Sequence, residues 1–197
     1  DFAGLTGARF GAEGGETPGE GGETPEAPAA TNRADFETLT KTSSYTTNTT
    51  TNGWVLTNCA VQEGKASAPD ANPAYVVIGY VEGTETFAKA ACMNGKTSAV
   101  GSITSPTLTT GCGTLKFNYG LPFGDTKIKF TVDIIQNGEI VKTFTVDNSS
   151  ATKLTKYSFE ETIDVAGEFQ IVFKNLSPSN STSNKDRTAI WDVEWTG

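Results

Sequence analysis

Histidine is absent from this sequence of 197 residues. Its absence excludes the Ser-His-Asp and Cys-His catalytic arrangements, zinc sites with histidine ligands, and the side chain that most often acts as a general base near neutral pH. Long apolar runs are missing too, since none reaches the ~20 residues that a membrane-spanning helix requires. No glycine-rich loop leads from a strand into a helix, so nucleotide binding has no support.

Cysteine is scarce, with three residues at Cys59, Cys92 and Cys112. They lack the C-x-x-C spacing of thiolate metal sites and redox motifs. One disulfide and one free thiol would suit an exported protein, and the sequence does not select a pairing. We favour three buried thiols that act as small apolar residues.

Negative charge predominates, with a net charge of −8, which argues against a phosphate-neutralising surface and therefore against nucleic acid as a partner. Much of this charge lies in residues 1–30, so that residues 31–197 hold 17 acidic and 14 basic residues, a net charge of −3. Residues 11–30 contain GGETP twice and nothing apolar larger than alanine, a composition typical of a flexible acidic linker. We interpret residues 1–10 as a tail or the remnant of an upstream region, and residues 31–197 as the folded domain.

The folded part is rich in β-forming residues and frequent turns, and helical periodicity is hard to find. Residues 127–136 alternate between apolar and polar side chains, and Asn137-Gly138 then suits a type I′ hairpin turn into a return strand at 139–146. Further strands are expected at residues 34–39, 54–62, 74–81, 89–93, 97–103, 114–120, 156–163, 168–175 and in the C-terminal stretch that includes residues 188–195. The pattern predicts an all-β fold, an antiparallel two-sheet β-sandwich of the jelly-roll type.

The last expected strand carries two tryptophans. Strict alternation places Ala189, Trp191, Val193 and Trp195 on one face and the residues between them on the other. We therefore expect Trp191 and Val193 to fill the core, and Trp195, near the strand end, to be half covered.

Several segments resemble a known family: "ADFETL", "NGWVLTNCAV", "NGKTSAVGSITSPTLTTGCGTLKFNYG" and "KDRTAIWDVEWTG". Together they are similar to a jelly-roll domain of secreted and surface-anchored proteins of Bacteroidetes-type bacteria, akin to the choice-of-anchor J and MAM-like modules among the galactose-binding-like jelly rolls. The resemblance runs from about Ala34 to Gly197. It implies an exported monomer at the cell surface, outer membrane or periplasm of a Gram-negative bacterium, attached through a lipidated cysteine upstream of this chain.

The resemblance also implies that the first and last strands lie side by side, with a structural calcium ion near them. Glu37 and Asp192 are the carboxylates that match this site, supported by Asp35 and Glu194. Oxygen ligands of this kind suit Ca²⁺. The alternative is that Glu37 and Asp192 are solvated or paired with a nearby cation (Arg33, Lys185 or Arg187).

Exposed aromatic rings beside polar loops are candidates for stacking on sugars. Tyr119 and Phe123 flank "GLPFGD", Tyr45 precedes the polar run "TTNTTTN", and Trp195 is close to a strand end. These four residues are the predicted ligand-binding positions. For most other aromatics the strand register favours the core.

A glycosidase is a weaker alternative. Jelly-roll glucanases carry carboxylates in a Glu-x-Asp-x-x-Glu pattern, and Asp192 and Glu194 have the alternation, but Ile190 occupies the place of the first Glu. We therefore predict a non-catalytic surface module that binds carbohydrate or serves in adhesion. The alternative is a protein-interaction or accessory domain of a larger surface hydrolase of the nuclease or glycosidase kind.

Overall fold

The computed structural model describes residues 29–63, 89–153 and 155–197. In these ranges the chain forms one short 3-10 helix and eleven β-strands, all paired antiparallel: β1 (Thr31–Arg33), η1 (Phe36–Thr38), β2 (Thr46–Thr49), β3 (Val55–Glu63), β4 (Lys89–Met93), β5 (Ser102–Thr104), β6 (Cys112–Gly120), β7 (Ile128–Gln136), β8 (Glu139–Asn148), β9 (Tyr157–Val165), β10 (Gln170–Asn175) and β11 (Thr188–Thr196). The all-β antiparallel prediction is confirmed. The described ranges hold no helix of the length and hydrophobicity needed to cross a membrane. The strand predicted at residues 74–81, the tail and most of the linker fall outside the described residues.

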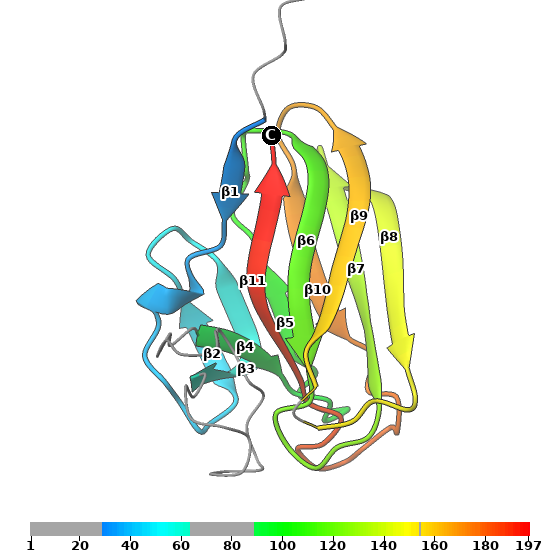
Figure 1. The fold of residues 1–197 in the computed structure, drawn as a ribbon. Helices are drawn as coiled ribbons and strands as arrows, with labels where there is room; N and C mark the ends of the chain where they lie inside the picture. Colours follow the sequence, from blue (N-terminus) through cyan, green and yellow to red (C-terminus); the bar gives the residue numbers. More distant parts are fainter. Residues whose placement is uncertain (1–28, 64–88, 154) are drawn as a thin grey trace, which may run out of the picture.

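The strands form two facing layers that share β3 (Figure 1). They are hydrogen-bonded in the order β8-β7-β10-β5-β3-β4-β11-β6-β9, with β1 added to β11 and β2 to β3. The first part of β3 pairs with β5 and the part from Cys59 onward pairs with β4. Asn58, between the two parts, has a positive φ of 51°, a conformation that asparagine tolerates better than most residues. The chain therefore turns from one layer into the other at Asn58.

The β7–β8 hairpin is confirmed. The apolar residues at alternate positions of β7, from Ile128 to Ile134, are fully buried. Asn137 and Gly138 both have positive φ, 52° and 81°, as a type I′ turn requires. The turn and the alternation of β7 agree, so the hairpin follows from local sequence. Its register does not follow entirely, because the pairing shifts by one residue between Ile134 and Ile135.

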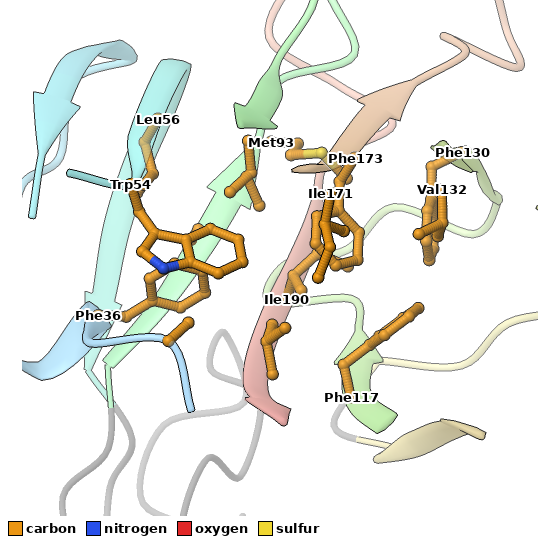
Figure 2. Packing of buried hydrophobic residues seen from close by; sticks show 14 of the residues in the cluster. Phe36, Trp54, Leu56, Met93, Phe117, Phe130, Val132, Ile171, Phe173 and Ile190 are labelled. Atoms are coloured by element: carbon orange, nitrogen blue, oxygen red, sulfur yellow. The ribbon is translucent and has the colours of Figure 1, made fainter. Parts of the chain in front are cut away.

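Aromatic side chains from both layers meet in the core (Figure 2). The ring of Phe117 on β6 lies edge-on to Phe173 on β10, with centroids 5.0 Å apart, and stacks on Phe159 on β9 at 4.5 Å. Burial of such rings is the main favourable contribution to the free energy of folding. The three cysteines are free and buried, which confirms the favoured interpretation of their role.

The strand predicted at residues 34–39 is wrong, because Phe36–Thr38 forms a 3-10 turn. The carboxylate of Asp35 accepts a hydrogen bond from the backbone N–H of Asn52 at 2.8 Å, which holds this segment against the turn before β3. Phe36 and Leu39 are both buried, and their spacing of three residues places them on one side of a 3-10 turn. The opening strand lies earlier, at β1, and it pairs with β11 as expected for the first and last strands.

The strand predicted at residues 97–103 is shorter than expected, because β5 begins at Ser102. A Cβ atom at Gly101 would lie 2.4 Å from the backbone nitrogen of Asn94, so glycine is needed where the two segments approach. β2 was not predicted, since the run of threonine and asparagine around Thr46–Thr49 resembles a loop in composition.

Candidate functional site

The candidate site depends on a β-bulge in β11. Trp191 pairs with Asn118 of β6 and Glu194 with Lys116, so three steps along β11 match two steps along β6. The extra residue allows Asp192 to adopt a positive φ of 50°. A bulge of this kind reverses the side-chain alternation beyond it.

The strict alternation predicted for the last strand is therefore wrong. Ile190 joins Val193 and Trp195 in the main core, whereas Ala189 and Trp191 pack with Ala90 in a small second cluster. The paired partner of Trp191, Asn118, lies on the face of β6 opposite to Phe117, so the second cluster occupies the outer face of this sheet.

Trp195 fills the core, which differs from the half-covered platform that we predicted. The residue is only 5 % exposed, and the centroid of its ring lies 6.1 Å from that of the Trp54 ring. Its Nε1–H donates a hydrogen bond to the hydroxyl of Thr110 at 2.9 Å.

A hollow of about 470 Å³ lies over the outer face of β11, β6 and β9. We call it the outer hollow. Lys116 and Asn118 point into it because they alternate with the core residues of β6. Besides Phe117 and Phe159, its lining residues are Arg33, Lys116, Asn118, Ser158, Glu160, Asp192 and Glu194.

A row of hydrogen bonds crosses the strands along the outer hollow. The Arg33 guanidinium of β1 contacts Oδ1 of Asp192, and Asn118 Nδ2 donates to Oδ2 of the same carboxylate at 3.2 Å. Ser158 of β9 then donates its hydroxyl hydrogen to Asn118 Oδ1 at 2.8 Å. Beside this row, Lys116 Nζ lies 3.1 Å from a carboxylate oxygen of Glu160. Mutual hydrogen bonds between strands hold these polar groups in fixed positions.

The two carboxylates predicted to bind calcium meet at a cation. Arg33 lies 3.4 Å from Glu37 and also forms the ion pair with Asp192, which is the alternative that the sequence left open. In the described ranges no three carboxylate, cysteine or histidine side chains form a group that could hold a metal ion. Since Ca²⁺ takes six to eight oxygen ligands, an ion at this place would have to displace Arg33 and recruit further ligands. Calcium binding stays a prediction.

Tyr45 and Phe123 lie together at another place, joined by Arg187. The guanidinium carbon of Arg187 lies 4.1 Å from the centroid of the Phe123 ring, and its Nε donates to Asp125 at 2.8 Å. The hydroxyl of Tyr45 interacts with Arg187 and with the thiol of Cys92, and burial raises the pKa of Tyr45 well above its usual value. The Asp125 side chain is 7 % exposed, and these contacts fasten the loops. Ligand binding by the partly buried Tyr45 and Phe123 stays a prediction.

Tyr119 belongs neither to the lining of the outer hollow nor to the contacts around Arg187. It shares the core-facing side of β6 with Phe117, and its ring stacks on that of Tyr157 at 5.5 Å. Burial raises its pKa above the usual value. The structure thus brings together only Tyr45 and Phe123 of the four predicted ligand-binding residues.

The polar residues of β6 and β9 in the outer hollow are not among the site residues predicted from the sequence: Lys116, Asn118, Ser158 and Glu160. The signal was their alternation with apolar neighbours in "TLKFNYG" and "KYSFEE". Alternation shows which residues face outward. It does not show that outward residues from different strands converge.

Comparison with known proteins supports the fold. The sequence matches no protein-family model and no curated protein. Among solved structures, the K2 cleaved adhesin domain of Lys-gingipain has a TM-score of 0.50 and 13% identity, over 85% of this chain and 100% of that domain. Lower similarity is found for the family 6 module CsCBM6-3 of Clostridium stercorarium in complex with cellobiose, with a TM-score of 0.39 and 15% identity over 86% of this chain and 93% of that one. The CBM51 module of Clostridium perfringens in complex with methyl-galactose has a TM-score of 0.37 and 12% identity over 85% and 100%. The chain is a β-sandwich domain with the fold of the adhesin domain.

Proposed function

We propose that this chain is a non-catalytic surface module that binds carbohydrate in the outer hollow, in the service of glycan recognition or adhesion. The observation that carries the proposal is the row of hydrogen-bonded groups formed by Arg33, Asp192, Asn118 and Ser158 over one sheet face. Guanidinium, carboxylate, amide and hydroxyl groups are complementary to sugar hydroxyls, which both donate and accept hydrogen bonds.

The size and rigidity of the outer hollow support this role. Its volume of about 470 Å³ is within the usual range of ~300–1,000 Å³ for small-ligand sites. Its polar groups stand on paired strands and already bond to one another, so little side-chain entropy is lost when a ligand binds.

The pairing of the carboxylates supports a binding role. Oδ1 of Asp192 accepts a hydrogen bond from Arg33 and Oδ2 accepts one from Asn118, and each oxygen keeps a lone pair that can accept a sugar hydroxyl. Glu160 is likewise paired with Lys116. The carboxylates of the outer hollow therefore act as hydrogen-bond acceptors in this proposal.

We also propose that the protein is exported to the cell surface or the periplasm. The resemblance to choice-of-anchor J and MAM-like modules, and the fold shared with an adhesin domain, support an exported protein at the surface or in the periplasm of a Gram-negative bacterium. A monomer attached through an upstream lipidated cysteine is part of the same proposal.

A glycan array of neutral and acidic glycans tests the function, followed by calorimetry on any glycan that binds. Asn118→Ala removes the amide at the centre of the row and should weaken binding at least tenfold. The matched control is Asn52→Ala, because Asn52 is exposed in the turn before β3. Both variants are checked by thermal melting. The absence of binding to any glycan would refute the proposal and favour the protein-interaction or accessory role.

A further inference from the structure

We infer that the outer hollow takes an extended neutral glycan of at least two sugar units, with Glu194 as the residue that determines its specificity. This inference rests on the proposed function. It adds the class of ligand, from the shape, the pairing and the charge of the lining residues.

A second, smaller hollow of about 90 Å³ lies beside the outer hollow. Lys116 and Glu194 line both of them, so this pair lies between the two hollows. Besides Lys116, Glu194 and Trp195, the smaller one is lined by the hydroxyl-bearing residues Thr31, Thr114 and Thr196, from β1, β6 and β11. A chain of sugar units could therefore lie along the sheet face, with one unit in the outer hollow and part of the next unit over the smaller one.

Glu194 lies between the two hollows, and its backbone lies between two neighbouring strands. Its backbone is in register with Arg33 of β1 and with Lys116 of β6. Both neighbouring cations have other partners, since Arg33 bonds to Glu37 and Asp192 and Lys116 bonds to Glu160. In the described part of the chain, the Glu194 carboxylate itself has no hydrogen bond or ion pair.

An unpaired carboxylate on a rigid strand suits a pair of adjacent sugar hydroxyls. Its two oxygens can accept a hydrogen bond from each hydroxyl of a vicinal diol, and charge-assisted bonds of this kind are stronger than neutral ones. The position of Glu194 between the hollows places such bonds beside the linkage between two units.

The charge of the outer hollow excludes acidic glycans. Three carboxylates, Asp192, Glu160 and Glu194, stand against two cations, for a formal net charge of −1. Glu37 adds another negative charge beside Arg33. Because both cations are already paired, no unpaired positive charge in the hollow offsets the repulsion of a uronate or a sulfate by Glu194.

The test is calorimetry with defined probes: neutral cello-, xylo- and galacto-oligosaccharides of one to four units, and polygalacturonate and chondroitin sulfate as acidic probes. For the neutral series that binds, we expect the disaccharide to bind at least tenfold more tightly than the monosaccharide, and the acidic probes not to bind. Glu194→Ala should lower the affinity at least tenfold. Glu139→Gln in β8, on the other sheet, is the control and should change nothing.

A second variant isolates the smaller hollow. Thr114→Val keeps the β-branched shape and removes the hydroxyl, so it should reduce the gain from the second sugar unit and leave monosaccharide affinity unchanged. Equal affinity for one and two units, preference for an acidic probe, or a Glu194→Ala variant that binds normally would overturn the inference. If binding still depended on Asn118 in that case, the proposed function would stand. No binding to any probe would overturn both.

Discussion

Substitution of Asp192 tests the bulge that builds the outer hollow. Asp192 has a φ of 50°, in the left-handed region where a residue with a Cβ atom is strained by about 1–2 kcal/mol and glycine is not. Aspartate tolerates this region better than alanine. In an ordinary strand, glycine is less stable than alanine by roughly 0.5–1 kcal/mol. At position 192 we expect the opposite order.

The magnitude follows from the lost contacts. Asp192→Ala loses the hydrogen bond from Asn118, worth about 1 kcal/mol. It also loses the ion pair with Arg33, which contributes about 0.5 kcal/mol because the Arg33 and Asp192 side chains are 46% and 28% exposed. Aspartate itself carries part of the left-handed strain, so alanine adds only about 0.5 kcal/mol, and the expected decrease in the free energy of unfolding is about 2 kcal/mol. Asp192→Gly should lose about 1–1.5 kcal/mol, since it forfeits the contacts, whereas the strain that it relieves is largely offset by the greater entropy of the unfolded chain.

The assay is urea unfolding followed by tryptophan fluorescence, with the m-value required to stay constant. Asp133 is the matched control: it lies in β7 outside the left-handed region and also accepts a hydrogen bond, from Thr143 at 2.6 Å. At position 133 the alanine variant should be more stable than the glycine variant. An Asp192→Ala protein as stable as Asp192→Gly would refute the bulge geometry.

Three further predictions concern the core, the thiols and calcium. Phe117→Ala should lower the free energy of unfolding by about 3–5 kcal/mol, measured by urea unfolding, because the ring packs between both sheets; a loss below 1 kcal/mol would contradict this packing. Burial raises the pKa of Cys92 to about 12 and of Cys112 to about 11, whereas thiols in the unfolded chain ionise near pH 8.5. The buried thiols should therefore react with Ellman's reagent only after unfolding, and rapid labelling of the native protein would refute this. The free energy of unfolding should decline from about pH 9 to 12, because the thiols ionise first in the unfolded chain, and the decline should be less steep in Cys92→Ala. If calcium binds its two predicted carboxylates, EDTA lowers the Tm and excess CaCl₂ restores it, whereas an unchanged Tm would refute the calcium prediction.

Local sequence predicted those parts of the fold in which neighbouring residues agree. In β7, the alternation from Ile128 to Ile134 and the Asn137-Gly138 turn specify the same hairpin. The prediction failed at Phe36, where a segment expected to be a strand forms a 3-10 turn. There the carboxylate of Asp35 bonds to a backbone group 17 residues away, a contact that strand propensity does not register.

The candidate site was predictable only in part. The alternation of Lys116 and Asn118 with apolar neighbours shows that they face outward, and Asp192 and Glu194 were recognised as carboxylates of interest. Their grouping depends on which strands are neighbours. The four aromatic candidates were chosen by type and flanking composition, and neither reveals that Trp195 is turned into the core.

By itself, the sequence determined the all-β class, the two apolar layers and the Asn137-Gly138 turn, because each depends on side chains within a few residues of one another. Only the tertiary structure decided the bulge at Asp192, the meeting of Arg33 with a carboxylate 159 residues away, and the hollow that they line. The physical reason is that strand order and register arise from backbone hydrogen bonds between distant segments. An offset of one residue in that register moves every following side chain to the opposite face.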